Sequence, residues 1–119
     1  MEVKAITRNV RIGPRKARDL ARAVMGRSVG DALRIVEFSP RKAATLLSKT
    51  LKSAMANAQH NHQLDVDTLN VKYCVFDEGS RMRRFWPRAR GSASPIEKQL
   101  CHVTVILTDE VIAKKKKRK

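Results

Sequence analysis

The chain has 119 residues, with 26 Lys and Arg against 11 Asp and Glu, and its formal net charge is +15. A charge this basic indicates a polyanionic partner, because lysine and arginine neutralise phosphates and release bound counterions. No apolar run approaches the roughly 20 residues of a membrane span, and residues 1–6 have no apolar signal core. The sequence therefore favours a compact cytoplasmic domain with basic surfaces and no membrane partner.

The first part of the chain predicts one short strand and one helix. Glu2–Arg8 alternates loosely, as a strand does. The following helix starts at Pro14 and ends near Gly26, because proline suits the first helical turn and glycine accepts the left-handed conformation past a helix end. Its predicted buried stripe consists of Ala17, Leu20, Ala21 and Val24. Its opposite face carries Arg15, Arg18 and Arg22.

Two further helices are expected before residue 62. Ser28 and Asp31 resemble a capping box, which predicts a short helix running to about Phe38. Ser39 followed by proline predicts a capping hydroxyl at the start of a long helix that ends near Asn61. The apolar face of this long helix consists of Ala43, Leu47, Ala54 and Ala58, with Ala44, Leu51 and Met55 beside them.

After the long helix the apolar period changes to alternation, which predicts two half-buried strands. The inward positions of the first are Leu69, Val71, Tyr73 and Val75. Those of the second are Cys101, Val103, Val105 and Leu107. Cys74 and Cys101 form no Cys-x-x-Cys pattern, so we expect two reduced, half-buried thiols rather than a disulfide or a metal site.

The segment between these strands, residues 77–99, is the most informative part of the chain. A connection this long inside a compact domain is usually functional or disordered. Arginine forks bind phosphate in bidentate fashion, and aromatic rings stack on unpaired bases. The segment carries both kinds of side chain and has no acid between Gly79 and Ile96: Arg81, Arg83, Arg84, Phe85, Trp86, Arg88 and Arg90. The pattern favours RNA contact, and the alternative is a floppy loop with a solvated charge run.

If the flanking strands pair antiparallel and the pairing continues outward, this segment forms a long hairpin arm. About eleven residues per side at ~3.3 Å each would reach roughly 35 Å beyond the domain. Arg90, Gly91 and Ser92 would lie near its tip, because glycine permits a tight turn. We therefore predict one domain over residues 1–113 and a basic tail over residues 114–119 that is disordered until it meets a partner.

Patterns that carry catalysis or bind metal are missing. Residues 60–67 contain two histidines and two aspartates, but their spacing matches no standard zinc pattern. There is no Gly-rich phosphate loop and no nucleophile elbow. Cys101 and His102 are neighbours on a predicted strand, so they point to opposite faces and make a poor catalytic pair. We expect no enzymatic activity, no metal and no cofactor.

Several short segments, taken together, resemble a known family. They are Val10–Arg18, Ser39–Ala44, Ser53–Ala58, Pro87–Gly91 and His102–Val105. From about Val3 to Leu107 the chain resembles the protein 22 family of the large ribosomal subunit, in its bacterial form. The resemblance implies an α+β fold, with three helices packed on a small three-stranded antiparallel sheet and a long protruding β-hairpin.

The resemblance also implies a function. Members of this family are structural constituents of the large ribosomal subunit that bind its RNA, support assembly and line the nascent-peptide exit tunnel with the hairpin tip. The expected partners are therefore large-subunit ribosomal RNA, neighbouring ribosomal proteins and the nascent peptide near the tip, with the chain a monomer within a bacterial or organelle-encoded ribosome.

Candidate site residues follow from the matched motifs and from the arm. The candidate RNA-binding residues are Arg11, Arg15, Lys16, Arg18, Arg81, Arg83, Arg84, Phe85, Trp86, Arg88, Arg90 and Lys98. The candidate tip consists of Arg88, Ala89, Arg90, Gly91 and Ser92. For the arginines of the first helix, a solvated face and direct phosphate contact both remain open. The chain departs from the family at Glu97, an acid that would face phosphates at some cost unless a cation pairs with it.

Two other functions compete with this interpretation. A DNA-binding or DNA-compacting protein would share the charge and could insert the hairpin into a groove. Aromatic rings within an arginine-rich arm nevertheless suit unpaired RNA bases better than a B-form groove. A nucleic-acid-processing enzyme would need a convergent acid or metal cluster, which the sequence does not contain.

Overall fold

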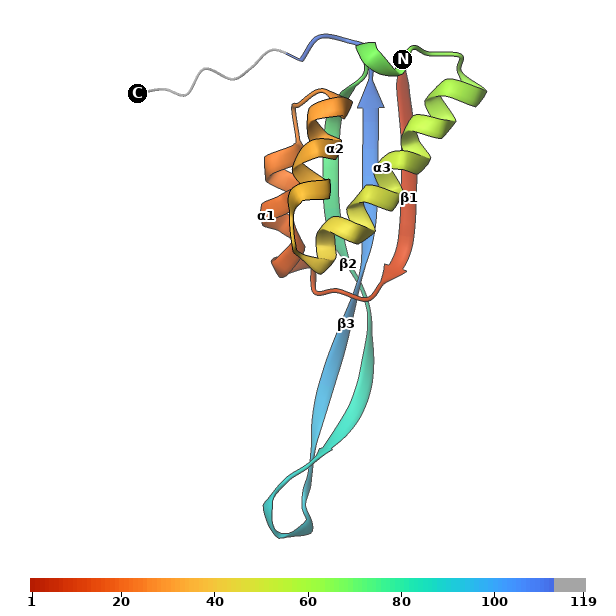
Figure 1. Ribbon diagram of the computed structural model, residues 1–119. Coiled ribbons are helices and arrows are strands. Elements are labelled where there is room, and N and C mark those ends of the chain that lie inside the picture. The colour runs from red at the N-terminus through yellow and green to blue at the C-terminus, as the bar shows by residue number, and fades with distance from the viewer. Residues whose placement is uncertain (113–119) are drawn as a thin grey trace.

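The computed structural model describes residues 1–112, and the predicted basic tail lies outside this range. These residues form three strands and three helices (Figure 1). Their bounds are β1 (Glu2–Val10), α1 (Pro14–Val24), α2 (Val29–Phe38), α3 (Lys42–Asn61), β2 (Asn70–Pro87) and β3 (Ala93–Thr108). Short 3-10 turns lie at Val66–Thr68 and Ala89–Gly91.

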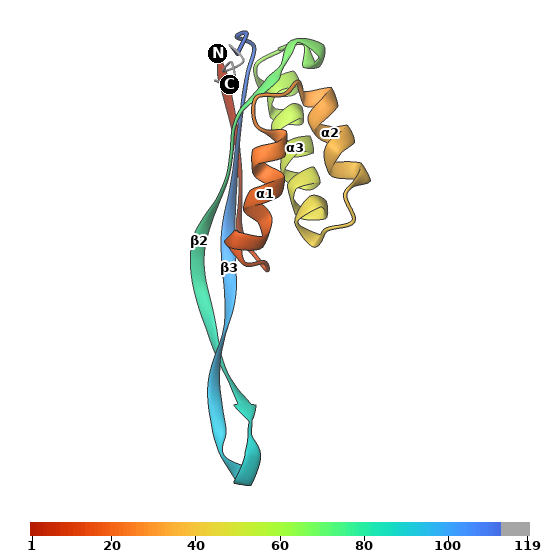
Figure 2. The same ribbon diagram turned by 90° about the vertical axis from the view of Figure 1, so that its left-hand side faces the viewer.

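The strands form one antiparallel sheet in the order β1-β3-β2. All three helices cover the same face of this sheet, and the other face is left open (Figure 2). Beyond the helices, β2 and β3 continue together as a two-stranded arm (Figure 1), and the molecule is 61 Å long. The predicted α+β fold with a protruding β-hairpin is thus confirmed.

The core lies between the sheet and the helices, and most of its members are those that periodicity predicts. All four predicted positions of α1 and of the last strand are buried, as are those of the long helix. Ala44 and Leu51, predicted beside this face, are buried as well, and Thr50 is an addition. Thr50 is the polar member, and its hydroxyl lies 2.8 Å from that of Thr7 on β1. Helix periodicity and strand alternation therefore identify the packed layer.

In β2 the predicted alternation is wrong beyond Val71. The pairing with β3 shifts between Val71 and Tyr73, so one extra residue interrupts the ladder. Such a bulge moves every later side chain to the opposite face. Cys74 and Phe76 are consequently buried, whereas Tyr73 lies exposed on the open face of the sheet.

The predicted start of the long helix is also wrong. Helix α3 begins at Lys42 with Arg41 at its N-cap position, and no side chain caps it. Ser39 instead ends α2, and its N–H donates to the carbonyl of Val36 at 3.3 Å. Proline disfavours helical backbone in the residue before it, which keeps Ser39 extended at ψ 130°.

Two other predicted helix boundaries are confirmed. The N–H of Asp31 donates to the Ser28 hydroxyl oxygen at 3.3 Å, so Ser28 caps α2. Gly26 has φ +81°, the left-handed conformation expected past the end of α1. Strand β1 runs two residues further than predicted, and Asn9 near its end also has a positive φ, of 56°.

The two cysteines are buried on the helix-covered face and are not joined to each other. Burial raises the pKa of the Cys74 thiol to about 12, and it raises the pKa of Cys101 as well. This placement fits the expectation of reduced thiols. Both cysteines are fully buried, however, and not half-buried as predicted. Within residues 1–112, no group of three or more His, Cys, Asp or Glu residues is placed to hold a metal ion.

Candidate RNA interface

The arm consists of the outer parts of β2 and β3, from the Arg81–Gln99 pair to the Pro87–Ala93 pair. Successive residues of a strand point to opposite faces, so the arm presents two different surfaces. One face carries Arg81, Arg83 and Phe85, and the other carries Met82, Arg84 and Trp86. Each face thus combines arginine with one aromatic ring.

Both aromatic side chains of the arm are open to solvent. Phe85 is 80% exposed and Trp86 is 56% exposed. Large apolar rings are normally buried unless a partner covers them, and rings amid arginines suit stacking on bases. The one tryptophan of the sequence therefore lies outside the core.

Glu97 is the single acid between Gly79 and Leu100, and a cation pairs with it. Arg81 donates through Nη1 to Glu97 Oε2 at 2.8 Å, although the residue opposite Arg81 across the arm is Gln99. The pair is thus diagonal, which a long arginine side chain can span. The arginines further out along the arm have no ion pair in the described residues, so their charges face solvent.

The tip is a tight turn between Arg88 and Ser92. The N–H of Arg88 donates to the carbonyl of Ser92 at 2.7 Å, and the Ser92 hydroxyl donates to the carbonyl of Ala89 at 2.8 Å. Arg90 and Gly91 both have positive φ, at 58° and 71°. The predicted tip residues therefore form the turn, and every one of them is exposed.

At the base of the arm, two backbone irregularities lie beside His102: the positive φ of Asn9 and the register shift between Glu78 and Arg81. Its Nδ1 accepts a hydrogen bond from the N–H of Asn9 at 3.1 Å. Gly79 lies against the other side of the ring, because a Cβ built there would be 3.2 Å from His102 Cε1 and 3.1 Å from the carbonyl oxygen of Leu100. The imidazole thus joins β1 to the point where the arm leaves the sheet.

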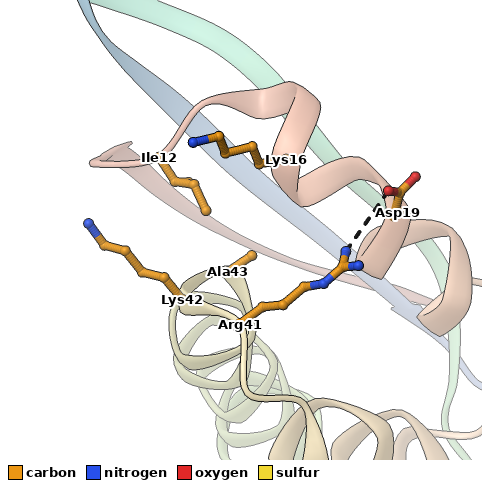
Figure 3. Close-up of a pocket in the computed structure, with 6 residues that line it drawn as sticks. All are labelled: Ile12, Lys16, Asp19, Arg41, Lys42 and Ala43. Carbon is orange, nitrogen blue, oxygen red and sulfur yellow. Dashed lines mark ion pairs between the residues drawn. The ribbon is translucent and has the colours of Figure 1, made fainter.

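Beside the arm base, α1 and α3 enclose a groove that we call the α1–α3 groove (Figure 3). It contains two adjoining pockets that share Ile12, Lys16 and Lys42. The first, of about 440 Å³, is completed by Asp19, Arg41 and Ala43. The second, of about 370 Å³, is completed by Arg11, Gly13, Lys98 and Gln99. The Lys42 ammonium donates to the carbonyl of Arg11 at 2.8 Å, which ties α3 to the end of β1.

The groove is electropositive for two reasons. Its second pocket is lined by four cations and no acid. Helices α1 and α3 also both begin at the groove, with no acid in the first turn and no side-chain cap. Helix N-termini carry partial positive charge and free N–H groups, so they add to the field of the cations.

The structure brings together only part of the predicted site. Arg11, Lys16 and Lys98 meet in the groove, although Lys98 is distant in sequence from the other two. Arg15 and Arg18 lie exposed on α1 outside its lining, so a solvated face and phosphate contact stay open for them. Sequence reasoning missed Asp19, Arg41 and Lys42, whose roles as lining depend on how α1 and α3 pack.

No helix in the described part of the chain is both long and apolar enough to cross a membrane.

Comparison with known proteins identifies a family. Residues 5–108 match the model of the family described as Ribosomal protein L22p/L17e. One similar relative is the large ribosomal subunit protein uL22 of Akkermansia muciniphila, which is 54% identical over 92% of this chain and 98% of its own length. Another is uL22 of Thermosipho africanus, which is 50% identical over 92% of this chain and 74% of its own length. The uL22 protein of a Thermotoga species is 49% identical over 92% of this chain and 69% of its own length. The chain therefore belongs to the ribosomal protein L22p/L17e family, whose members are structural proteins of the cytoplasmic ribosome and not enzymes.

Proposed function

We propose that the chain binds large-subunit ribosomal RNA through its arm and its α1–α3 groove, and that the arm tip lines the nascent-peptide exit tunnel. Its family membership makes it a structural constituent of the large ribosomal subunit. The observation that carries the RNA proposal is the arm itself. Two exposed rings and unpaired arginines lie on a paired two-stranded stem that extends beyond the helices (Figure 2).

The arm suits irregular RNA better than it suits a smooth duplex. Arginine binds phosphate in a fixed fork and stacks on bases, and each exposed ring offers a stacking surface. The groove supplies a second contact region at the arm base, so RNA that follows the arm would also reach the cations of Arg11, Lys16, Lys42 and Lys98. Binding through both regions would fix the direction of the arm and support folding of the RNA during assembly.

A direct test measures the affinity of the full chain for large-subunit ribosomal RNA and for duplex DNA over a salt series. We expect tight binding of the RNA that persists at high salt, and weak binding of DNA that falls steeply, because phosphate attraction alone is strongly salt-dependent. Equal affinities and equal salt slopes for the two nucleic acids would overturn the RNA proposal and favour a DNA-compacting protein.

The tunnel proposal needs its own test, because RNA contact alone does not locate the tip. Both native cysteines are buried, so one exposed cysteine can be labelled selectively. A photo-crosslinker on Ala89→Cys in ribosomes stalled during translation should capture the nascent chain, whereas the same label on Ser53→Cys of α3 should not. Capture from both positions, or from neither, would count against a tunnel role for the tip.

We also expect the chain to act as a single copy next to neighbouring ribosomal proteins. The open face of the sheet provides uncovered apolar surface for such a contact, because Ile6 and Tyr73 are exposed there.

A further inference from the structure

We infer that the α1–α3 groove holds one extruded guanine nucleotide of the bound RNA, with the base in the first pocket and its phosphate in the second. The inference rests on the proposed RNA-binding function and adds a site and a base preference to it. Three features of the groove carry it: an apolar pocket, a carboxylate that makes no hydrogen bond within residues 1–112, and an adjoining cluster of cations.

The first pocket is apolar within a strongly charged surface. Ile12 and Ala43 form much of its wall, and the aliphatic stem of Lys16 extends along it (Figure 3). Its volume of about 440 Å³ falls in the range of about 300–1,000 Å³ that small-molecule sites occupy. A flat ring system that is apolar on its faces and polar at its edges fits such a wall, and an unstacked nucleobase has that chemistry.

Asp19 lines the first pocket and is the one acid among the residues that line the two pockets. Its carboxylate can accept hydrogen bonds from a ligand. Its contacts with Arg22 at 3.8 Å and Arg41 at 3.9 Å are longer than hydrogen bonds. None of the hydrogen bonds within residues 1–112 involves its side chain. Two arginines offset its charge, and because the side chain is mostly exposed and neither arginine lies within hydrogen-bond distance, its oxygens stay available to N–H groups at the edge of a ligand.

The two carboxylate oxygens select among the bases. Guanine presents two adjacent donors on its Watson–Crick edge, and a carboxylate accepts both together. Cytosine and adenine each present one amino group beside an acceptor nitrogen. Uracil presents one N–H between two carbonyl oxygens that repel the carboxylate. The Arg41 guanidinium, which reaches across the pocket toward Asp19 in Figure 3, adds a planar group for stacking.

The second pocket accounts for the phosphate of the same nucleotide. Its cations come from the connection after β1, from both helices and from the returning strand of the arm: Arg11, Lys16, Lys42 and Lys98. Because the pockets share three residues, a base in one and its phosphate in the other lie a short distance apart. The hydrogen bond from Lys42 to Arg11 holds one ammonium in place before RNA arrives.

Asp19→Asn distinguishes this site from general electrostatic attraction. The change removes one negative charge, so attraction to phosphates alone predicts equal or tighter RNA binding. Recognition of guanine predicts weaker binding instead, because the amide turns one acceptor into a donor that opposes the base. Asp31→Asn is the matched control, since Asp31 also pairs with an arginine three residues on, at 3.8 Å, but lies on α2 outside the groove.

The experiment uses the full chain bound to large-subunit ribosomal RNA, with thermal unfolding to verify that both variants fold. Affinity is measured, and guanines are probed with a reagent that modifies their Watson–Crick edge. We expect wild type and Asp31→Asn to protect one unpaired guanine that Asp19→Asn leaves reactive, with an affinity loss of about fivefold or more for Asp19→Asn alone.

Each other result has a definite meaning. Equal protection and equal affinity for the two variants would overturn the guanine site and leave the proposed RNA binding intact. Tighter binding by Asp19→Asn would show that the groove attracts phosphate without reading a base, which also overturns it. A wild-type chain that does not bind this RNA at all would overturn the proposed function itself.

Discussion

Arg81 on β2 and Glu97 on β3 form a diagonal ion pair across the arm, with 2.8 Å between Nη1 and Oε2. The pair explains how an acid is accommodated in a stem that otherwise carries only positive charge. It also means that Arg81 is partly neutralised by a neighbour, whereas the arginines further out are not. Both side chains are about half exposed, so solvent screens the pair and its contribution to stability is small.

Replacing Glu97 should strengthen RNA binding. Glu97→Gln frees Arg81 to contact a phosphate, so we expect a severalfold gain in affinity and a steepening of the salt slope by about one. Glu37→Gln is the control, because Glu37 also pairs with a cation, Lys52 at 3.8 Å, but lies on α2. A loss of affinity, or an unchanged slope, for Glu97→Gln would indicate that Arg81 acts only within the arm.

Removing the exposed rings of the arm should weaken RNA binding without unfolding the protein. Base stacking contributes about 1–3 kcal/mol per ring. We therefore expect Phe85→Ala and Trp86→Ala each to lower affinity for ribosomal RNA at least about fivefold, with unfolding free energies within about 0.5 kcal/mol of wild type. Phe38→Ala is the control, since Phe38 is 87% exposed but lies at the end of α2. Equal losses for all three would contradict a specific role of the arm.

A side chain at Gly79 should destabilise the base of the arm. A Cβ there would lie 3.1–3.2 Å from the Leu100 carbonyl oxygen and the His102 ring, so the imidazole that binds the Asn9 N–H would have to move. We expect Gly79→Ala to destabilise the fold by about 1–3 kcal/mol in urea unfolding. In Gly30→Ala the new Cβ meets nothing within 4 Å and lies in helix α2, so stability should stay the same or rise by about 0.5 kcal/mol. Equal stabilities for the two variants would mean that the ring does not hold the arm base.

Alkaline pH should destabilise the fold through Cys74. Burial raises the pKa of this thiol from 9.0 to about 12 in the folded chain, so between these values the unfolded chain releases a proton that the folded chain keeps. The protonated Cys74 thiol therefore makes its full contribution to the stability of the fold below pH 9, and this contribution declines as the pH rises. We measure the unfolding free energy in urea at pH 8 and at pH 10. Wild type should lose about 1 kcal/mol more between these two values than Cys74→Ala does. Parallel curves would show that the thiol ionises equally in both states.

Periodicity was sufficient to predict the layers of the fold, and local chemistry was not sufficient to predict its irregularities. The stripes of α1, α3 and β3 follow from 3.6-residue and two-residue repeats. The bulge after Val71 does not, because the sequence around it reads equally well without an extra residue, and Tyr73 therefore exchanged faces with Cys74. Ser39 and Pro40 match a helix start locally, yet the end of α2 uses Ser39.

The arm and the groove differ in how much of each could be predicted. The arm is local in sequence, so its arginines and rings stand out together between two strands. The groove joins residues of the β1–α1 connection, α1, α3 and β3, and Lys16 and Lys42 meet only because α1 packs beside α3. Asp19 was not predicted because a single acid beside Arg18 and Arg22 resembles ordinary charge pairing along a helix.

The central claim is that this chain is held in the large ribosomal subunit by RNA contacts of its arm. The most direct measurement follows a tagged chain on sucrose gradients of native-cell lysate before and after a high-salt wash. It compares wild type with a variant in which four arm arginines are replaced by glutamine, Arg83, Arg84, Arg88 and Arg90. We expect wild type to stay with the large subunit after the wash and the variant to be released. Release of wild type, its migration with chromosomal DNA, or equal retention of the two chains would contradict the claim.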